Sequence, residues 1–278
     1  MAIIEIILLF ILGFTVGLPA SLAGVGGGFL IMPALIFFFG LSAQNAVAVS
    51  IAAILGTTIS STLVYLKQKR VDFFLGLLYD VFDVPGVILG AYLASLITSS
   101  MLTGFIGVFI IFLSILLVIR KEPFLDNPRS SNTEGAKNKV LKREKIDSGG
   151  KIFSYKIKNP ALIFLSSFAG GLVTGFAGLG GGITDTSTMI LLGIPAHVAV
   201  ASSEFAMALT NGAGLLAHGF LDNLLIEYAV PLTIGTMVGA LIGAVLGKRV
   251  KGSIIRKVLV ILACIAGIRL LIFAFGFP

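Results

Sequence analysis

Ten apolar segments account for most of this 278-residue chain. Hydrophobic residues make up 57% of the sequence and charged residues only 12%, whereas charged residues are about 25% of a soluble domain. So few polar side chains cannot cover a water-facing surface. Most of the segments approach or exceed the roughly 20 apolar residues that a helix needs to cross a bilayer. The sequence therefore predicts an all-α protein that crosses the membrane many times.

The segments fall into two groups of five, separated by a polar stretch. The first group is 3–22, 27–40, 43–66, 73–97 and 101–120, and the second is 160–177, 182–193, 196–219, 226–247 and 253–276. We divide the chain into a first membrane repeat (1–120), a basic linker (121–158) and a second membrane repeat (159–278). The linker is too polar for lipid, and its composition is typical of a flexible connection rather than of a small folded domain.

The two groups are similar to each other in sequence. Each has a glycine-rich break before its second segment, Ala-Gly-Val-Gly-Gly-Gly at 23–28 and Ala-Gly-Leu-Gly-Gly-Gly at 177–182. Three small residues of the fourth segments also align, namely Gly86, Gly90 and Ala91 with Gly235, Gly239 and Ala240. Because each copy has an odd number of segments, the second copy must be inverted in the membrane. We therefore predict two inverted five-segment repeats with broken second and seventh helices.

The basic residues indicate how the chain is oriented. Half of the 20 Lys and Arg residues lie between Lys121 and Lys158, and most of the others form short clusters at segment ends. The positive-inside rule then places the linker in the cytoplasm and both termini outside. Nucleic-acid binding is not predicted, because this distribution follows the loops of a membrane protein instead of forming one basic face.

The second segment of each copy is too short to cross the membrane by itself. About 13 residues of helix rise only ~20 Å, whereas the hydrocarbon core is ~30 Å thick. Irregular backbone at this depth is tolerated only where protein or a water-filled cavity satisfies it. In transporters built from inverted repeats, broken helices meet near the midplane and form the substrate site. We therefore expect the two helix N-termini to converge on one central site.

An anion suits such a site, because a helix N-terminus offers unpaired N–H groups and a partial positive charge. Almost every Lys and Arg lies at a segment end, so backbone N–H groups and hydroxyls would hold the anion. The alternative role of the glycines is close helix packing. The predicted substrate-binding residues are Gly24, Gly26, Gly27, Gly28, Ser21, Gly178, Gly180, Gly181, Gly182, Thr184, Thr186 and Ser187.

Acidic residues inside predicted spans are candidates for coupling transport to protons, because lipid makes a buried carboxylate costly. We single out Glu204, Asp83 and Asp185. Asp185 has an alternative role as an ordinary acid at a helix N-terminus, where its charge would repel an anion. The sequence shows no catalytic signature, no cofactor motif and no cysteine–histidine metal spacing. We therefore expect no enzyme, no cofactor and no metal site.

The duplicated pattern resembles the TauE/SafE family of sulfite exporters and anion permease-like membrane proteins. The resemblance rests on the paired glycine breaks, on the aligned glycine pairs and on a similar stretch after each break, Gly-Leu-Ser-Ala-Gln at 40–44 and Gly-Ile-Pro-Ala-His at 193–197. It covers nearly the whole chain except 121–158. It implies transport of small sulfur-containing anions or organosulfonates, such as sulfite or sulfoacetate, with the break glycines at the site. The second copy has Thr184 and Asp185 after its break, which makes its half of the site more polar than the first.

Together these features predict a secondary transporter in the cell membrane that moves a small anion by alternating access. Two alternatives stay open. One is a cation carrier or channel that uses the intramembrane carboxylates, and the other is a membrane assembly factor that transports nothing itself. The pattern specifies neither the exact substrate nor the direction of transport, the coupling ion or the oligomeric state.

Overall fold

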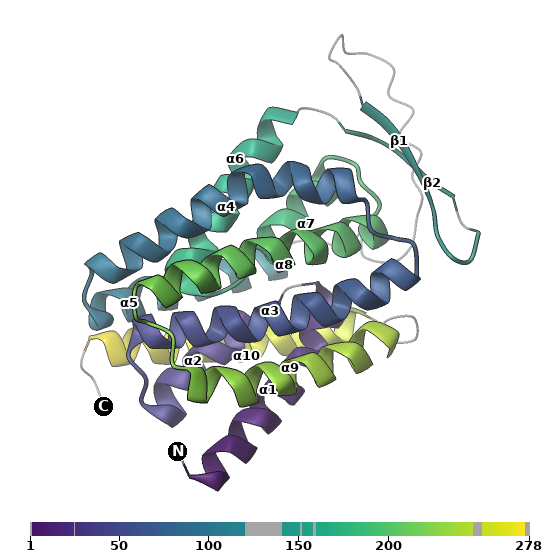
Figure 1. Cartoon of the computed structure of the whole chain (residues 1–278). Helices are drawn as coiled ribbons and strands as arrows, with labels where there is room; N and C mark the ends of the chain where they lie inside the picture. Colours follow the sequence, from purple (N-terminus) through teal and green to yellow (C-terminus); the bar gives the residue numbers. More distant parts are fainter. Residues whose placement is uncertain are drawn as a thin grey trace.

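The computed structural model describes residues 2–24, 26–119, 141–150, 152–157, 160–246 and 252–275. These ranges hold ten helices and one two-stranded β-hairpin (Figure 1). The helices are α1 (Ile3–Ala23), α2 (Gly28–Phe39), α3 (Ala43–Lys67), α4 (Phe73–Leu96), α5 (Ser99–Ile119), α6 (Pro160–Ala177), α7 (Gly182–Leu191), α8 (Ala196–Phe220), α9 (Ile226–Leu246) and α10 (Gly252–Ala274). The strands are β1 (Leu141–Ile146) and β2 (Ile152–Ile157).

Each helix begins and ends within two residues of a predicted apolar segment. Within the described ranges, four stretches are long and apolar enough to cross a membrane, namely Ile3–Leu22, Ala43–Lys67, Phe73–Leu96 and Ile226–Leu246. Large apolar side chains are exposed along the outer faces of α1, α4 and α9, as expected where lipid replaces water as the solvent. The predicted all-α polytopic membrane fold is thus confirmed.

The helices pack in pairs that join the two halves of the chain. Helix α1 packs along α9 and α4 along α6, while α3 contacts both α8 and α9, and α5 pairs with α10. Helices α1 to α5 of the first half correspond in order to α6 to α10 of the second. The α1–α9 contact therefore has an equivalent in α6–α4, and the α3–α9 contact has one in α8–α4, and both of these pairs also pack together. Two copies related by a two-fold axis would give this interchange. The inversion of the copies remains a prediction.

Glycine permits the closest of these helix contacts. A Cβ atom on Gly90 of α4 would overlap the carbonyl oxygen of Leu172 in α6, and one on Gly239 of α9 would overlap that of Phe14 in α1. Gly90 and Gly239 are aligned positions of the two copies. Here the glycines serve close packing, as small residues commonly do between membrane helices.

Residues 141–150 and 152–157 differ from the flexible linker expected over 121–158. They form the β1–β2 hairpin, in which Leu141 lies opposite Ile157 and Ile146 opposite Ile152. An isolated hairpin is marginally stable in water, but this one buries Phe153 and Tyr155 in a cluster with side chains of α4, α7 and α8. Tertiary packing, absent from a composition argument, therefore stabilises it. The rest of the predicted linker lies outside the described residues.

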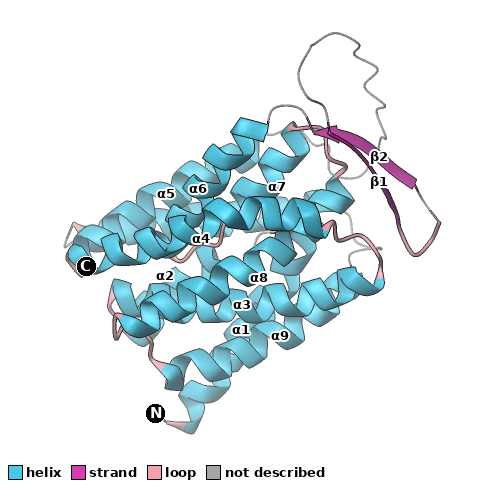
Figure 2. Cartoon of the chain, turned by 45° about the horizontal axis from the view of Figure 1, so that its top comes forward, coloured by secondary structure: helices cyan, strands magenta, loops and turns pink. Residues whose placement is uncertain are grey.

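The hairpin lies at one end of the helical bundle, and the chain termini lie toward the other end (Figure 1). Figure 2 shows the same hairpin in magenta beside the helix ends. The placement of the termini on one side of the membrane and of the linker on the other remains a prediction. Which side is cytoplasmic remains a prediction from the basic residues.

Candidate functional site

Both glycine breaks require backbone conformations that side chains disfavour. Gly24 ends α1 with a φ of +67°, and Gly26 and Gly27 follow with φ of +76° and +86°. In the second copy, Gly178 and Gly180 have φ of +63° and +79°. A Cβ atom is strained in this left-handed region, and glycine is not. The breaks are therefore turns that end one helix and begin a short one.

The two breaks lie against each other in the interior. A Cβ atom on Gly28 would overlap the carbonyl oxygen of Gly178, and one on Gly182 would lie 2.7 Å from that of Gly24. These contacts are equivalent, because Gly28 aligns with Gly182 and Gly24 with Gly178. The structure thus brings together the first residues of α2 and α7, and all eight predicted break glycines are buried.

Apolar side chains enclose much of this meeting point. A Cβ atom on Gly26 would lie 2.9 Å from Ile54 of α3, and one on Gly182 would lie 2.7 Å from Met207 of α8. The carbonyl oxygen of Gly178 accepts a 2.8 Å hydrogen bond from Ser50. A ligand could reach the N–H groups of the breaks only if side chains of α3 and α8 moved aside.

The predicted hydroxyl residues occupy different positions around the breaks. Thr186 is buried, and its hydroxyl donates a 3.5 Å hydrogen bond to the carbonyl oxygen of Gly24 across the contact. Thr184 and Ser187 are half-buried on the same short helix. Ser21 is buried too, but its hydroxyl donates to Leu18 of its own helix at 3.1 Å. Thr186 is therefore the one that connects the two copies directly.

Two predicted coupling residues, Asp83 of α4 and Asp185 of α7, lie close together beside α6. A Cβ atom on Gly170 would lie 3.0 Å from Asp185 Oδ1 and 3.6 Å from Asp83 Oδ1. Asp83 is 1% exposed and Asp185 is fully buried. In the described part of the chain, neither carboxylate has a hydrogen-bond partner or a salt bridge. No group of acidic, histidine or cysteine side chains there has an arrangement that could hold a metal ion.

The third coupling candidate, Glu204 of α8, belongs to a separate cluster. It is fully buried, and both carboxylate oxygens lack a hydrogen-bond partner among the described residues. Its electrostatic neighbours are Ser61 and Tyr65 of α3. Tyr65 donates a 3.0 Å hydrogen bond to the carbonyl oxygen of Ser21. Glu204 is therefore positioned near the end of α1 rather than beside the aspartate pair.

Two polar neighbours of the acidic residues on α4 and α7 were not predicted from the sequence. Thr210 of α8 donates a 2.8 Å hydrogen bond to Asp80 Oδ1. Tyr79 is fully buried with its hydroxyl unpaired by any described residue, and it interacts electrostatically with Asp185 and Asp83. No motif marks these residues, since only the packing of α4 and α7 against α6 and α8 makes them neighbours.

A third polar cluster, centred on Asp72, joins the hairpin to the helices. Asp72 caps α4 by accepting hydrogen bonds from the N–H groups of Phe74 (3.1 Å) and Leu75 (3.3 Å). It also accepts bonds from Arg143 Nε (2.7 Å) and Tyr155 Oη (2.5 Å). Burial alone would raise the pKa of Asp72, but the bonds from Tyr155 and Arg143 outweigh it and hold this pKa below its usual value.

Comparison with known proteins identifies the family. The family model described as "Sulfite exporter TauE/SafE" matches residues 9–270. The chain is 30% identical over 273 residues to "Probable membrane transporter protein YunE" of Bacillus subtilis, covering 93% of this chain and 96% of that protein. It is 26% identical over 276 residues to a protein of Methanocaldococcus jannaschii with the same descriptive name, covering 94% of this chain and 92% of the relative.

No solved structure matches the chain. The family match nevertheless extends through both sets of helices, from α1 to α10, and includes both glycine breaks. The relatives align over nearly their full lengths and carry names of membrane transporters. This chain therefore belongs to the sulfite exporter TauE/SafE family of membrane transporters.

Proposed function

We propose that the protein is a secondary transporter for a small sulfur-containing anion, either an oxyanion such as sulfite or an organosulfonate such as sulfoacetate. The observation that carries the proposal is the contact between the two glycine breaks, through Gly28 with Gly178 and Gly182 with Gly24. Because α2 and α7 begin at this contact, their N-terminal N–H groups would be available to a shared ligand once the covering side chains of α3 and α8 moved aside. The name of the family supports the choice of anion.

The electrostatic argument depends on the helix ends. Each helix N-terminus carries about half a positive charge, so two of them together approach the charge of a monovalent anion. Glycine allows the anion to approach the N–H groups without a Cβ atom in the way. In the described residues, both salt bridges lie at the hairpin and none lies at the breaks. The helix ends would therefore provide the main positive potential at this depth.

Access to this site would alternate between the two sides of the membrane. Ile54 and Met207 lie against the breaks, and under this proposal these two side chains would close the site. Inverted-repeat transporters open by moving one helical bundle against the other around a fixed site. The α3–α8 pair, which carries both covering side chains, would move away from the breaks to admit the anion from either side.

A second candidate function, a cation carrier, is favoured by the pair Asp83 and Asp185. Both carboxylates are buried near the start of α7 and lack partners among the described residues. An ionised Asp185 would repel an anion at the same helix end. Under the anion proposal, the pair would instead carry a proton that accompanies the substrate. The anion transporter would therefore require an anion and protons, whereas the cation carrier would require only a cation.

Uptake of labelled sulfite and labelled sulfoacetate by proteoliposomes tests the proposal, with sulfate and chloride as competitors. The site variants are Gly26→Ala and Gly180→Ala, which place a Cβ atom in the breaks. The matched control is Gly40→Ala, because Gly40 has a φ of +64° and nothing within 4 Å of an added Cβ atom. The control therefore carries similar backbone strain without crowding the proposed site.

We expect both break variants to lose at least about 90% of uptake, the loss that about 1.4 kcal/mol of binding energy would cause, while the control retains most of it. Equal uptake by break variants and control would exclude anion binding at the breaks. Transport that requires sodium ions but neither sulfite nor sulfoacetate would support the cation carrier instead.

A further inference from the structure

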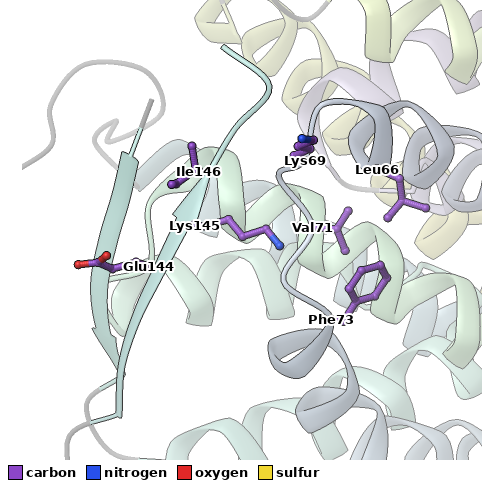
Figure 3. A pocket seen from close by; sticks show the side chains of 7 residues that line it. All are labelled: Leu66, Lys69, Val71, Phe73, Glu144, Lys145 and Ile146. Carbon is purple, nitrogen blue, oxygen red and sulfur yellow. The ribbon is translucent and has the colours of Figure 1, made fainter. Parts of the chain in front are cut away.

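A pocket separates the hairpin from the corner between α3 and α4 (Figure 3). Its volume is about 290 Å³. Two of the lining residues are basic, Lys69 and Lys145, and one is acidic, Glu144. The apolar part of the wall comes from Leu66, Val71, Phe73 and Ile146. The pocket is distinct from the glycine breaks, and the transport proposal assigns it no role.

The pocket has an excess of positive charge. The nearby Arg70 and Arg143 are paired with Asp147 and Asp72. In contrast, no ion pair is found for Lys69 or Lys145 within the described part of the chain. Figure 3 shows the Lys145 ammonium extending toward Val71 and Phe73, while the Glu144 carboxylate points away from the pocket. Two unpaired ammonium groups therefore favour an anionic ligand.

The apolar wall continues onto the surface that faces lipid. Leu66 near the end of α3 and Phe73 at the start of α4 are 36% and 49% exposed. Leu63 and Leu77, one turn farther along these helices, are also exposed. The charged corner 67–70 and the hairpin lie beyond them. The pocket thus spans the boundary between the apolar and the charged parts of the protein, at the level where lipid headgroups lie.

We propose that this pocket binds the headgroup of an anionic phospholipid from the leaflet on the hairpin side. The lipid phosphate lies between Lys69 and Lys145, and the first part of an acyl chain packs along Leu66 and Phe73. Basic pockets at this level bind anionic headgroups, and the exposed apolar wall favours a lipid over free phosphate. The bound lipid would connect β1 to the α3–α4 corner and so hold the hairpin against the bilayer.

Native mass spectrometry of the full-length protein in detergent tests this inference by titration with phosphatidylglycerol, phosphatidylcholine or inorganic phosphate. The pocket variant is Lys145→Gln. The matched control is Lys67→Gln, which removes the same charge from the exposed end of α3 outside the pocket lining. A third variant, Lys145→Arg, retains the charge. Thermal unfolding of each variant without lipid verifies that the fold is kept.

We expect Lys145→Gln to weaken phosphatidylglycerol binding about fivefold, the loss expected for one basic residue near an anionic surface. Lys67→Gln should change binding less than about twofold, and Lys145→Arg should bind as the unaltered protein does. Equal losses of phosphatidylglycerol binding in Lys145→Gln and Lys67→Gln would overturn the proposal. They would indicate that the lipid is attracted by the general positive charge and does not bind in the pocket. Equally tight phosphatidylcholine binding, or full competition by inorganic phosphate, would overturn the choice of an anionic lipid.

Discussion

Arg143 Nε lies 2.7 Å from Asp72 Oδ2, and this ion pair attaches β1 to the first turn of α4. Asp72 is 2% exposed, so the contact is shielded on the helix side. The Arg143 guanidinium also lies 4.7 Å from the centre of the Phe74 ring. The N–H group of Asp72 donates a 2.9 Å hydrogen bond to Ser202 of α8. The Asp72 side chain therefore connects the hairpin with α4, and the Asp72 backbone connects α4 with α8.

Replacing Arg143 should release the hairpin. Arg143→Ala removes two hydrogen bonds from a buried carboxylate, and a bond to a charged group contributes about 1.5–3 kcal/mol. We expect faster hydrogen exchange in 141–157 while the helix amides keep their protection. Glu144→Gln is the control on the same strand, because that side chain is exposed. Unchanged exchange in Arg143→Ala would show that the buried aromatic side chains alone hold the hairpin.

Hairpin docking should depend on pH only under acidic conditions. The folded-state pKa of Asp72 is below its ordinary value of 3.8. Its contribution to stability is therefore present above that pH and is lost as the pH falls through the lower, folded-state pKa. Burial and the bond to Asp72 raise the pKa of Tyr155 above its ordinary 10.0, so this group stays protonated at neutral pH. Hydrogen exchange corrected for its intrinsic pH dependence should show constant protection between about pH 5 and 9. A loss of protection near pH 6 to 7 would contradict this assignment.

The sequence predicted the helices well because apolar runs and glycine turns are local signals. It predicted the contact between the breaks because the pattern occurs twice. The hairpin was missed, since β1 is largely charged and its pairing depends on residues buried against α4, α7 and α8. The proximity of Asp83 to Asp185 was not predicted either, because no local pattern shows that α4 and α7 meet beside Gly170. Long-range packing thus accounts for what sequence reasoning could not supply.

The α4–α6 contact should be intolerant of even one added methyl group. A Cβ atom on Gly175 would overlap the carbonyl oxygen of Val87, so Gly175→Ala must force the helices apart. Overpacking of this kind costs about 1–3 kcal/mol. Gly212→Ala is the control, since an added Cβ atom there meets nothing within 4 Å and alanine favours helix by about 0.5–1 kcal/mol. Thermal unfolding in detergent should show a lower midpoint for the first variant only, and equal midpoints would disprove the close contact.

Neutralising the buried carboxylates should show, from the effects on uptake rate, that the two acidic clusters act independently of each other. Asp83 and Asp185 share one environment beside Gly170, whereas Glu204 lies near Ser61 and Tyr65. Groups in contact show non-additive effects, and distant groups show additive ones. We therefore expect Asp83→Asn and Asp185→Asn to be coupled in a double-mutant cycle of initial uptake rates, by at least about 0.5 kcal/mol. Glu204→Gln combined with Asp83→Asn should be additive.

The pH dependence of uptake then identifies the proton carrier. If Glu204 carries the proton, Glu204→Gln should flatten the pH profile of anion uptake in proteoliposomes, because an amide cannot titrate over this range. If the aspartate pair carries it, Asp83→Asn or Asp185→Asn should flatten the profile and Glu204→Gln should leave it unchanged. The fourth variant is Asp80→Asn, because Asp80 is also on α4, accepts a hydrogen bond from Thr210 and interacts electrostatically with both aspartates. An unaltered profile in Glu204→Gln would remove Glu204 as the proton carrier, and unaltered profiles in all four variants would exclude proton coupling through these carboxylates.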